Sequence, residues 1–136
     1  MLLAIVYAGC GNSTGTACGL FEYVDPLFTI VEAKNAISGT PVSPVYLSSI
    51  LFGDEPLPAE FLTYANAYGV NVVGDRLRCT VPCGFSSLQG EYQFAIGGAG
   101  YRDTTITLEG RYGRADGGCP SRFYDGVEIT LALTPL

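Results

Sequence analysis

The sequence predicts an all-β fold: a single β-sandwich or flattened β-barrel with one short helix, forming one domain over residues 1–136. Two observations lead to this prediction. Gly, Pro, Asn and Asp recur at short intervals, with apolar or β-branched runs between them, which is typical of strands joined by turns. The chain is also 48% apolar and only 15% charged, a balance that excludes intrinsic disorder and permits one buried core.

The runs between the turn residues define the expected strands. In chain order they cover residues 2–8, 20–24, 27–33, 45–52, 70–73, 76–81, 92–96, 104–109 and 127–133. Polar and apolar residues alternate in 76–81, 104–109 and 127–133. Because successive side chains on a strand point to opposite faces, each of these strands has one face toward the core.

Two pairs of turn residues predict hairpins. Gly74-Asp75 is a two-residue link of the Gly-first kind, which matches the twist of paired strands. Asp125-Gly126 is a second candidate, because Asp and Gly tolerate positive backbone angles. Segments 39–44 and 97–100 are, after 9–19, the loosest of the chain. Segments 9–19 and 113–120 are expected to be exposed loops beside the strands.

One helix is expected, over residues 58–68. Pro58 suits a first helical turn, Glu60 complements the positive end of the helix dipole, and Gly69 follows as a stop. Tyr64 and Tyr68 would lie beside the apolar face of this helix. We expect the helix simply to pack on the sheet.

The apolar run 2–8 is predicted to be a buried first strand. No Lys or Arg precedes Lys34, so the run lacks the basic start of a signal peptide. It is also far shorter than the ~20 residues of a membrane span. We therefore expect the chain to keep Met1, to fold in a cytoplasm and to have no membrane partner.

The chain has five cysteines: Cys10, Cys18, Cys79, Cys83 and Cys119. In a cytoplasm they would stay mostly reduced, as small buried or surface thiols. Disulfides remain an alternative, as does a zinc site built from Cys10 and Cys18 with Cys79 and Cys83. Neither spacing is the two-residue spacing that is usual in structural zinc sites.

Missing residue types exclude most chemistry. The chain has no His, so nucleophile–histidine arrangements are impossible. The glycine-rich segment 9–15 lacks the Lys of a phosphate-binding loop and the third Gly of the dinucleotide pattern. Two carboxylate pairs, Asp54 with Glu55 or Asp103 with Glu109, leave glycoside hydrolysis as an alternative. We expect no enzyme, no cofactor and no metal.

Charge placement favours a protein–protein interface. The net charge is −6, yet six of the seven cations are Arg and lie in 76–122. An acidic chain is a poor partner for nucleic acid, whereas Arg and aromatic residues are enriched at protein interfaces. The candidate interface residues are Arg76, Arg78, Tyr92, Tyr101, Arg102, Tyr112, Arg114, Arg122, Phe123 and Tyr124. They predict an Arg-bearing face that meets an acidic face of the next copy.

Three stretches carry a resemblance to a known family. They are AISGTPVSPVYLSSILFGDE (36–55), GVNVVGDRLRCTVP (69–82) and GEYQFAIG (90–97). Together they resemble the N-terminal module of bacteriophage tail-fibre or tail-collar proteins, with its Gly-Thr-Pro turn, apolar strand and Gly-Asp turn. The sequence departs from that pattern at Glu55, where the family has Gly, and it lacks the family's Glu-x-Gly-Leu-Phe segment.

The resemblance implies a β-rich, non-catalytic virion protein, assembled in the host cytoplasm. Its partners would be copies of itself and other virion proteins, in the tail, neck or fibre region. Three other classes stay open: a capsid decoration (cement) protein, a secreted disulfide-stapled β-sandwich that binds a ligand, and a small carboxylate enzyme.

Overall fold

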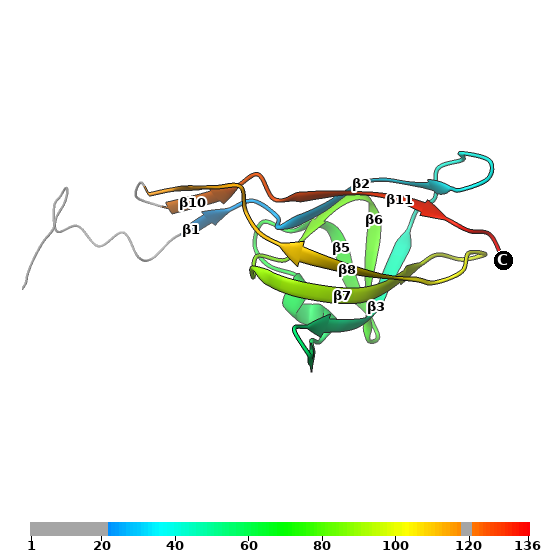
Figure 1. Cartoon of the computed structure of the whole chain (residues 1–136), viewed down its shortest axis with the longest axis horizontal. Coiled ribbons are helices and arrows are strands. Elements are labelled where there is room, and N and C mark those ends of the chain that lie inside the picture. Colours follow the sequence, from blue (N-terminus) through cyan, green and yellow to red (C-terminus); the bar gives the residue numbers. More distant parts are fainter. Residues whose placement is uncertain (1–21, 118–120) are drawn as a thin grey trace, which may run out of the picture.

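The computed structural model describes residues 22–117 and 121–136, and in them the predicted all-β fold is confirmed (Figure 1). The strands are β1 (Glu22–Val24), β2 (Phe28–Asn35), β3 (Val45–Phe52), β4 (Glu55–Pro56), β5 (Tyr68–Val73), β6 (Arg76–Phe85), β7 (Gly90–Gly97), β8 (Thr104–Gly110), β9 (Arg114–Asp116), β10 (Ser121–Tyr124) and β11 (Val127–Leu133). One 3-10 helix, η1 (Ala59–Leu62), follows β4.

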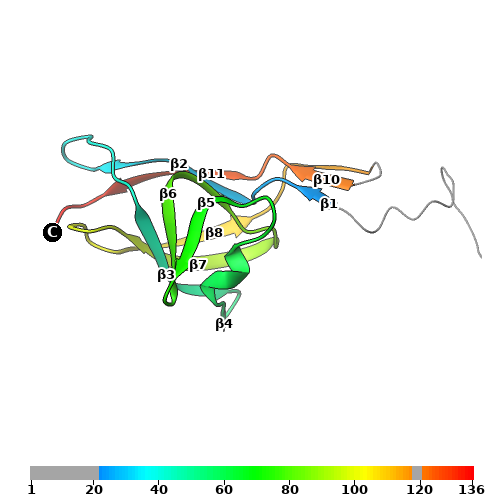
Figure 2. The same cartoon turned by 180° about the vertical axis from the view of Figure 1, so that it is seen from behind.

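The larger sheet in the described residues has the strand order β11-β2-β6-β3-β7-β8 and curls into a nearly closed barrel (Figures 1 and 2). β11 runs parallel to β2, while the other neighbours are antiparallel. The two end strands approach each other at one rim. There Tyr101 bridges to Pro135, and the Arg102 N–H donates to the Thr134 carbonyl at 2.9 Å.

Phe28 lies at the centre of the core. Its ring meets Tyr92 edge-on at 4.9 Å between centroids and contacts Phe85 and Phe94 at 5.6 and 6.1 Å. Strand alternation supplies much of the rest of the core, since buried and less buried residues alternate along Arg76–Cys79 of β6, Glu91–Ile96 of β7 and Glu128–Leu133 of β11. Burial of these large apolar side chains is the main favourable contribution to folding.

β6 changes partners halfway along its length. Its first part pairs with β3, through Leu77–Cys79, and its last part pairs with β2, through Cys83–Phe85. Between them Cys79 and Cys83 form a disulfide, with Cα atoms 5.8 Å apart. Four residues of extended strand would span about 13 Å, so residues 80–82 bulge out of the strand at this corner.

The disulfide contradicts the expectation of reduced thiols at these two positions. Cys79 and Cys83 are both fully buried, and a cystine has no thiolate to offer a metal. A zinc site that uses them is therefore wrong. Cys10, Cys18 and Cys119 lie outside the described residues, as does the predicted strand 2–8.

Most predicted strands are confirmed. Segments 45–52 and 127–133 match β3 and β11 at both ends, and Gly74-Asp75 links β5 to β6 as a hairpin, with Gly74 at φ +64°. The second predicted hairpin is wrong. Asp125 does have positive φ, but β10 and β11 pair with β1 and β2 rather than with each other.

The predicted helix over 58–68 is also wrong. Only η1 forms, with 3-10 hydrogen bonds from Phe61 to Pro58 and from Thr63 to Glu60. The Tyr64 hydroxyl instead reaches the Val24 carbonyl at 2.9 Å, and Tyr68 begins β5. Tertiary contacts thus override a weak helix preference. The loop expected over 113–120 contains β9.

A second sheet projects from one end of the barrel (Figure 1). Its strand order is β1-β10-β9, and β1 is parallel to β10. β1 leads into β2 and β10 leads into β11, so two parallel strand pairs follow each other along one ribbon. We call the three-stranded sheet the extension.

Candidate interaction surface

Four of the predicted interface residues come together on the extension. Arg122, Phe123 and Tyr124 are successive residues of β10, and Arg114 of β9 pairs with Tyr124. Because side chains alternate along a strand, Arg122 and Tyr124 share one face with Arg114, while Phe123 points to the other.

The first face is an Arg–Tyr stack. The Arg114 guanidinium lies over the Tyr124 ring at 4.4 Å from its centroid, and that of Arg122 lies at 5.8 Å. Arg114 Nε also contacts Asp125 Oδ2 at 2.7 Å, and Arg122 Nη2 contacts Asp25 Oδ1 at 2.8 Å. Exposed ion pairs of this kind contribute little to stability, but they hold both guanidinium planes beside the aromatic ring.

The opposite face anchors the extension to the barrel. The Phe123 ring packs on Tyr112 at 5.6 Å between centroids. The Tyr112 hydroxyl donates to the Asp25 carbonyl at 2.6 Å. Tyr64 and Asn66 both donate to the Val24 carbonyl, at 2.9 and 3.0 Å. Three side chains from the barrel therefore hold the base of β1.

These anchors affect the titration of the tyrosines. Burial, with the negative charge of Asp25 as a second cause, raises the pKa of Tyr64 to about 12. Burial also raises the pKa of Tyr112, with smaller contributions from Tyr64, Asp25 and Tyr92. A hydrogen bond to Asp125 raises the pKa of Arg114. Both anchoring hydroxyls therefore stay protonated, and able to donate, well above neutral pH.

A fifth predicted interface residue, Tyr112, packs on Phe123 as an anchor of the extension. The remaining predicted interface residues lie elsewhere. Arg76 stacks on the Tyr46 ring at 4.3 Å, beside Arg78 on β6. Tyr101 and Arg102 lie at the barrel rim where the C-terminal segment returns. The candidates do not form one continuous face.

Tyr92 is a wrong prediction as an interface residue. It is only 1% exposed and packs in the core between Phe28 and Phe52. Its hydroxyl lies 2.8 Å from Ser86 Oγ and also donates to the Leu88 carbonyl. Alternation along β7 indicates that the side chain at position 92 points inward. Strand alternation is therefore better evidence here than the general enrichment of Tyr at interfaces.

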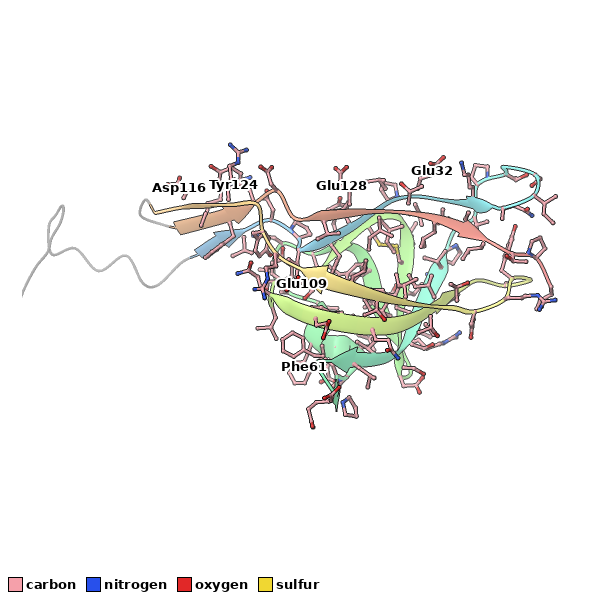
Figure 3. All side chains as sticks on the ribbon, viewed as in Figure 1. Glu32, Phe61, Glu109, Asp116, Tyr124 and Glu128 are labelled. Carbon is pink, nitrogen blue, oxygen red and sulfur yellow. A yellow bond between two sulfur atoms is a disulfide. The ribbon has the colours of Figure 1, made fainter. Side chains whose placement is uncertain are left out.

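Acidic side chains continue the surface along the ribbon. Figure 3 shows Glu32, Glu128, Tyr124 and Asp116 on the same side of the molecule, from β2 and β11 to the extension. A polar groove of about 530 Å³ lies where the two parts of the ribbon meet, lined by Asp25, Pro26, Thr29, Asp125, Gly126 and Glu128.

The sequence did not identify Asp25 and Asp125 as members of this surface. Both lie in turns, Asp25 before Pro26 and Asp125 before Gly126. Asp-Pro and Asp-Gly pairs predict a turn and do not indicate an ion pair. Their partnership with Arg122 and Arg114 appears only once the chain is folded. As a result, the Arg residues of the extension do not form a purely basic face opposite an acidic one.

Among residues 22–117 and 121–136, no three His, Cys, Asp or Glu side chains gather in a way that could hold a metal ion. The same residues contain no helix long and apolar enough to cross a membrane. The chain matches no protein-family model, and no curated protein or solved structure matches it.

Proposed function

We propose that this protein is a non-catalytic structural subunit of a bacteriophage-like virion, which mediates attachment or ring assembly in the tail, neck or fibre region. The observation that carries the proposal is the extension: a small sheet held out from the barrel with Arg122, Arg114 and Tyr124 on one face. Arg and Tyr, with Trp, are the side chains enriched among the residues that dominate binding energy at protein interfaces.

The way the extension is built supports a contact role. The hydroxyls of Tyr64 and Tyr112 fix its base, so docking would not have to order it first. Preorganisation of this kind lowers the entropic cost of association. In addition, β1 and β9 are the two edge strands of this sheet within the described residues, and open edges can pair with strands of another chain.

Size-exclusion chromatography with light scattering on the full chain tests the proposal. We expect a homo-oligomer, or co-assembly with another virion protein. Tyr124→Asp should weaken that assembly, because it puts a negative charge between the two ion pairs of the stack. Thr107→Asp, on the exposed side of β8, is the matched control and should assemble normally. A monomer at high micromolar concentration that joins no virion protein would refute the proposal.

The Cys79–Cys83 disulfide favours a second candidate, a binding module that works outside the cytoplasm. Disulfides persist in secreted proteins and on virion surfaces and are rare in a reducing cytosol. The two candidates differ in where the protein is found after lysis of the host. Recovery with purified particles supports the virion subunit, whereas recovery only as free secreted protein supports the binding module.

A further inference from the structure

A groove on the side of the barrel is separate from the extension. It has a volume of about 680 Å³ and lies among β3, β4, η1, β5 and the β5–β6 turn. Its walls are mainly apolar, with Ile50, Leu57 and Val72 among them. Phe61 of η1, which is 63% exposed (Figure 3), adds apolar surface to the same region of the barrel.

Val72, which lies beside this groove, is exposed although it is on the core-facing side of its strand. It pairs with Leu77 across the β5–β6 ladder, and residues that pair directly share one face of a sheet. Leu77 is fully buried on that face, yet Val72 is 41% exposed. The core-side face of β5 therefore lacks a covering layer that its neighbour strand has.

The outer edge of β5 is also open. Within the described residues, β5 pairs with β6 alone and makes no other backbone hydrogen bond. In a two-residue hairpin the pair next to the turn is hydrogen-bonded and the pairs then alternate. Val73 and Asn71 therefore bond to β6, while the N–H and C=O groups of Val70 and Val72 point outward.

The charged residues that line the groove are all acidic. Glu60 and Asp75 line it, and no Lys or Arg does. Asp54 and Glu55 lie close by at the β3–β4 turn. Whereas Asp25, Asp125 and Glu109 have Arg partners, none of these four carboxylates has an ion-pair partner in the part of the chain that the structure describes.

From these observations we propose that the groove binds an extended segment of a partner protein in which every second residue faces the groove, and that these groove-facing residues are apolar residues together with Lys or Arg. The segment adds antiparallel to the outer edge of β5. Its apolar side chains cover Val72 and enter the groove, and its cations meet Glu60 and Asp75. This is strand addition at an open sheet edge, and it does not depend on the role of the extension.

The probe is a synthetic peptide in which every second residue is Val or Lys and the residues between them are Ser, and its binding to the full chain is measured by fluorescence anisotropy. Its Val and Lys residues face the core side, so their N–H groups point to β5. Methylation of the Val amide nitrogens should abolish binding, whereas methylation of the Ser amide nitrogens should leave it intact. Hydrogen exchange should become slower at Val70 and Val72 upon binding, with little change at Asn71 and Val73.

Charge variants provide the second arm. Glu60→Gln combined with Asp75→Asn should weaken the peptide roughly two- to thirtyfold, as expected for two exposed ion pairs. Glu32→Gln combined with Glu128→Gln removes the same charge from the ribbon and should leave affinity unchanged. No saturable binding, equal binding of the Val-methylated peptide, protection only at β1 or β9, or self-pairing of β5 between two copies would each overturn the proposal.

Discussion

The Tyr112 hydroxyl donates a hydrogen bond to the backbone carbonyl of Asp25, 2.6 Å away, and so ties the barrel to the base of the extension. The two residues are far apart in the sequence but adjacent in the fold. Asp25 also holds Arg122 through its carboxylate. One residue thus links the anchor on one face of the extension with the Arg–Tyr stack on the other.

Tyr112→Phe should lower the free energy of unfolding by about 1 kcal/mol, because it removes this hydrogen bond and keeps the ring on Phe123. Chemical denaturation measures the loss, and hydrogen exchange should become faster in β1 and β10. Tyr124→Phe is the control, since the Tyr124 hydroxyl has no hydrogen-bond partner in the described residues. Equal effects of the two variants would contradict the anchoring role.

Alkaline pH should loosen the same anchor. The pKa of Tyr64 is raised from 10.0 to about 12 in the folded protein, so between these values the unfolded chain loses a proton that the folded chain keeps. The stability contribution is complete below pH 10 and is lost as pH rises toward 12. Denaturation midpoints across this range, with Tyr64→Phe as the comparison, measure it. If the stability of Tyr64→Phe fell with pH as steeply as that of the natural chain, the contribution of Tyr64 to this pH dependence would be ruled out.

The Cys79–Cys83 disulfide limits the number of free thiols. Under denaturing, non-reducing conditions no more than three of the five cysteines should react with a thiol reagent, whereas five reactive thiols would exclude the bond. Replacement of both residues by Ala should lower stability by about 2 kcal/mol, from the loop-entropy relation for so short a loop. Thermal melts with and without reductant, compared with the double variant, check this value.

Gly110 is required at the end of β8. A Cβ atom there would lie 2.6 Å from Leu27 Cδ2 and 2.7 Å from Phe28 Cζ, and both neighbours are fully buried. Gly110→Ala should therefore lower the free energy of unfolding by about 1–3 kcal/mol through overpacking. Gly117→Ala, where a Cβ meets nothing within 4 Å, should change it little. A fully stable Gly110→Ala variant would show that the core adapts at this point.

Local patterns predicted most of the strands. Alternation over 76–81, 104–109 and 127–133 placed the inward residues of β6, β8 and β11, because a strand must bury one face. Gly74 marked the β5–β6 turn in the sequence because Gly readily adopts the positive φ that it has there. These features depend only on neighbouring residues, so they can be read without knowledge of the partners.

Long-range contacts account for the errors. The helix expected over 58–68 gave way to the bond from Tyr64 to Val24, and residue type placed Tyr92 at an interface when it is a core residue. The second hairpin failed because β10 and β11 pair with β1 and β2. Parallel pairing joins distant segments and leaves no local turn signature.

The sequence by itself determined an all-β chain with little charge, no His and its Arg residues concentrated after residue 75. Only the tertiary structure decided that Arg114 and Arg122 stack on Tyr124 beside Asp125 and Asp25. It also decided that, in the part of the chain that the structure describes, the edge of β5 stays open next to carboxylates that have no ion-pair partner. The physical reason is that strand tendency is a property of neighbouring residues. Strand pairing depends on contacts between segments that are distant in the sequence. These contacts also determine which strand edge stays unpaired and which charged side chains have no partner.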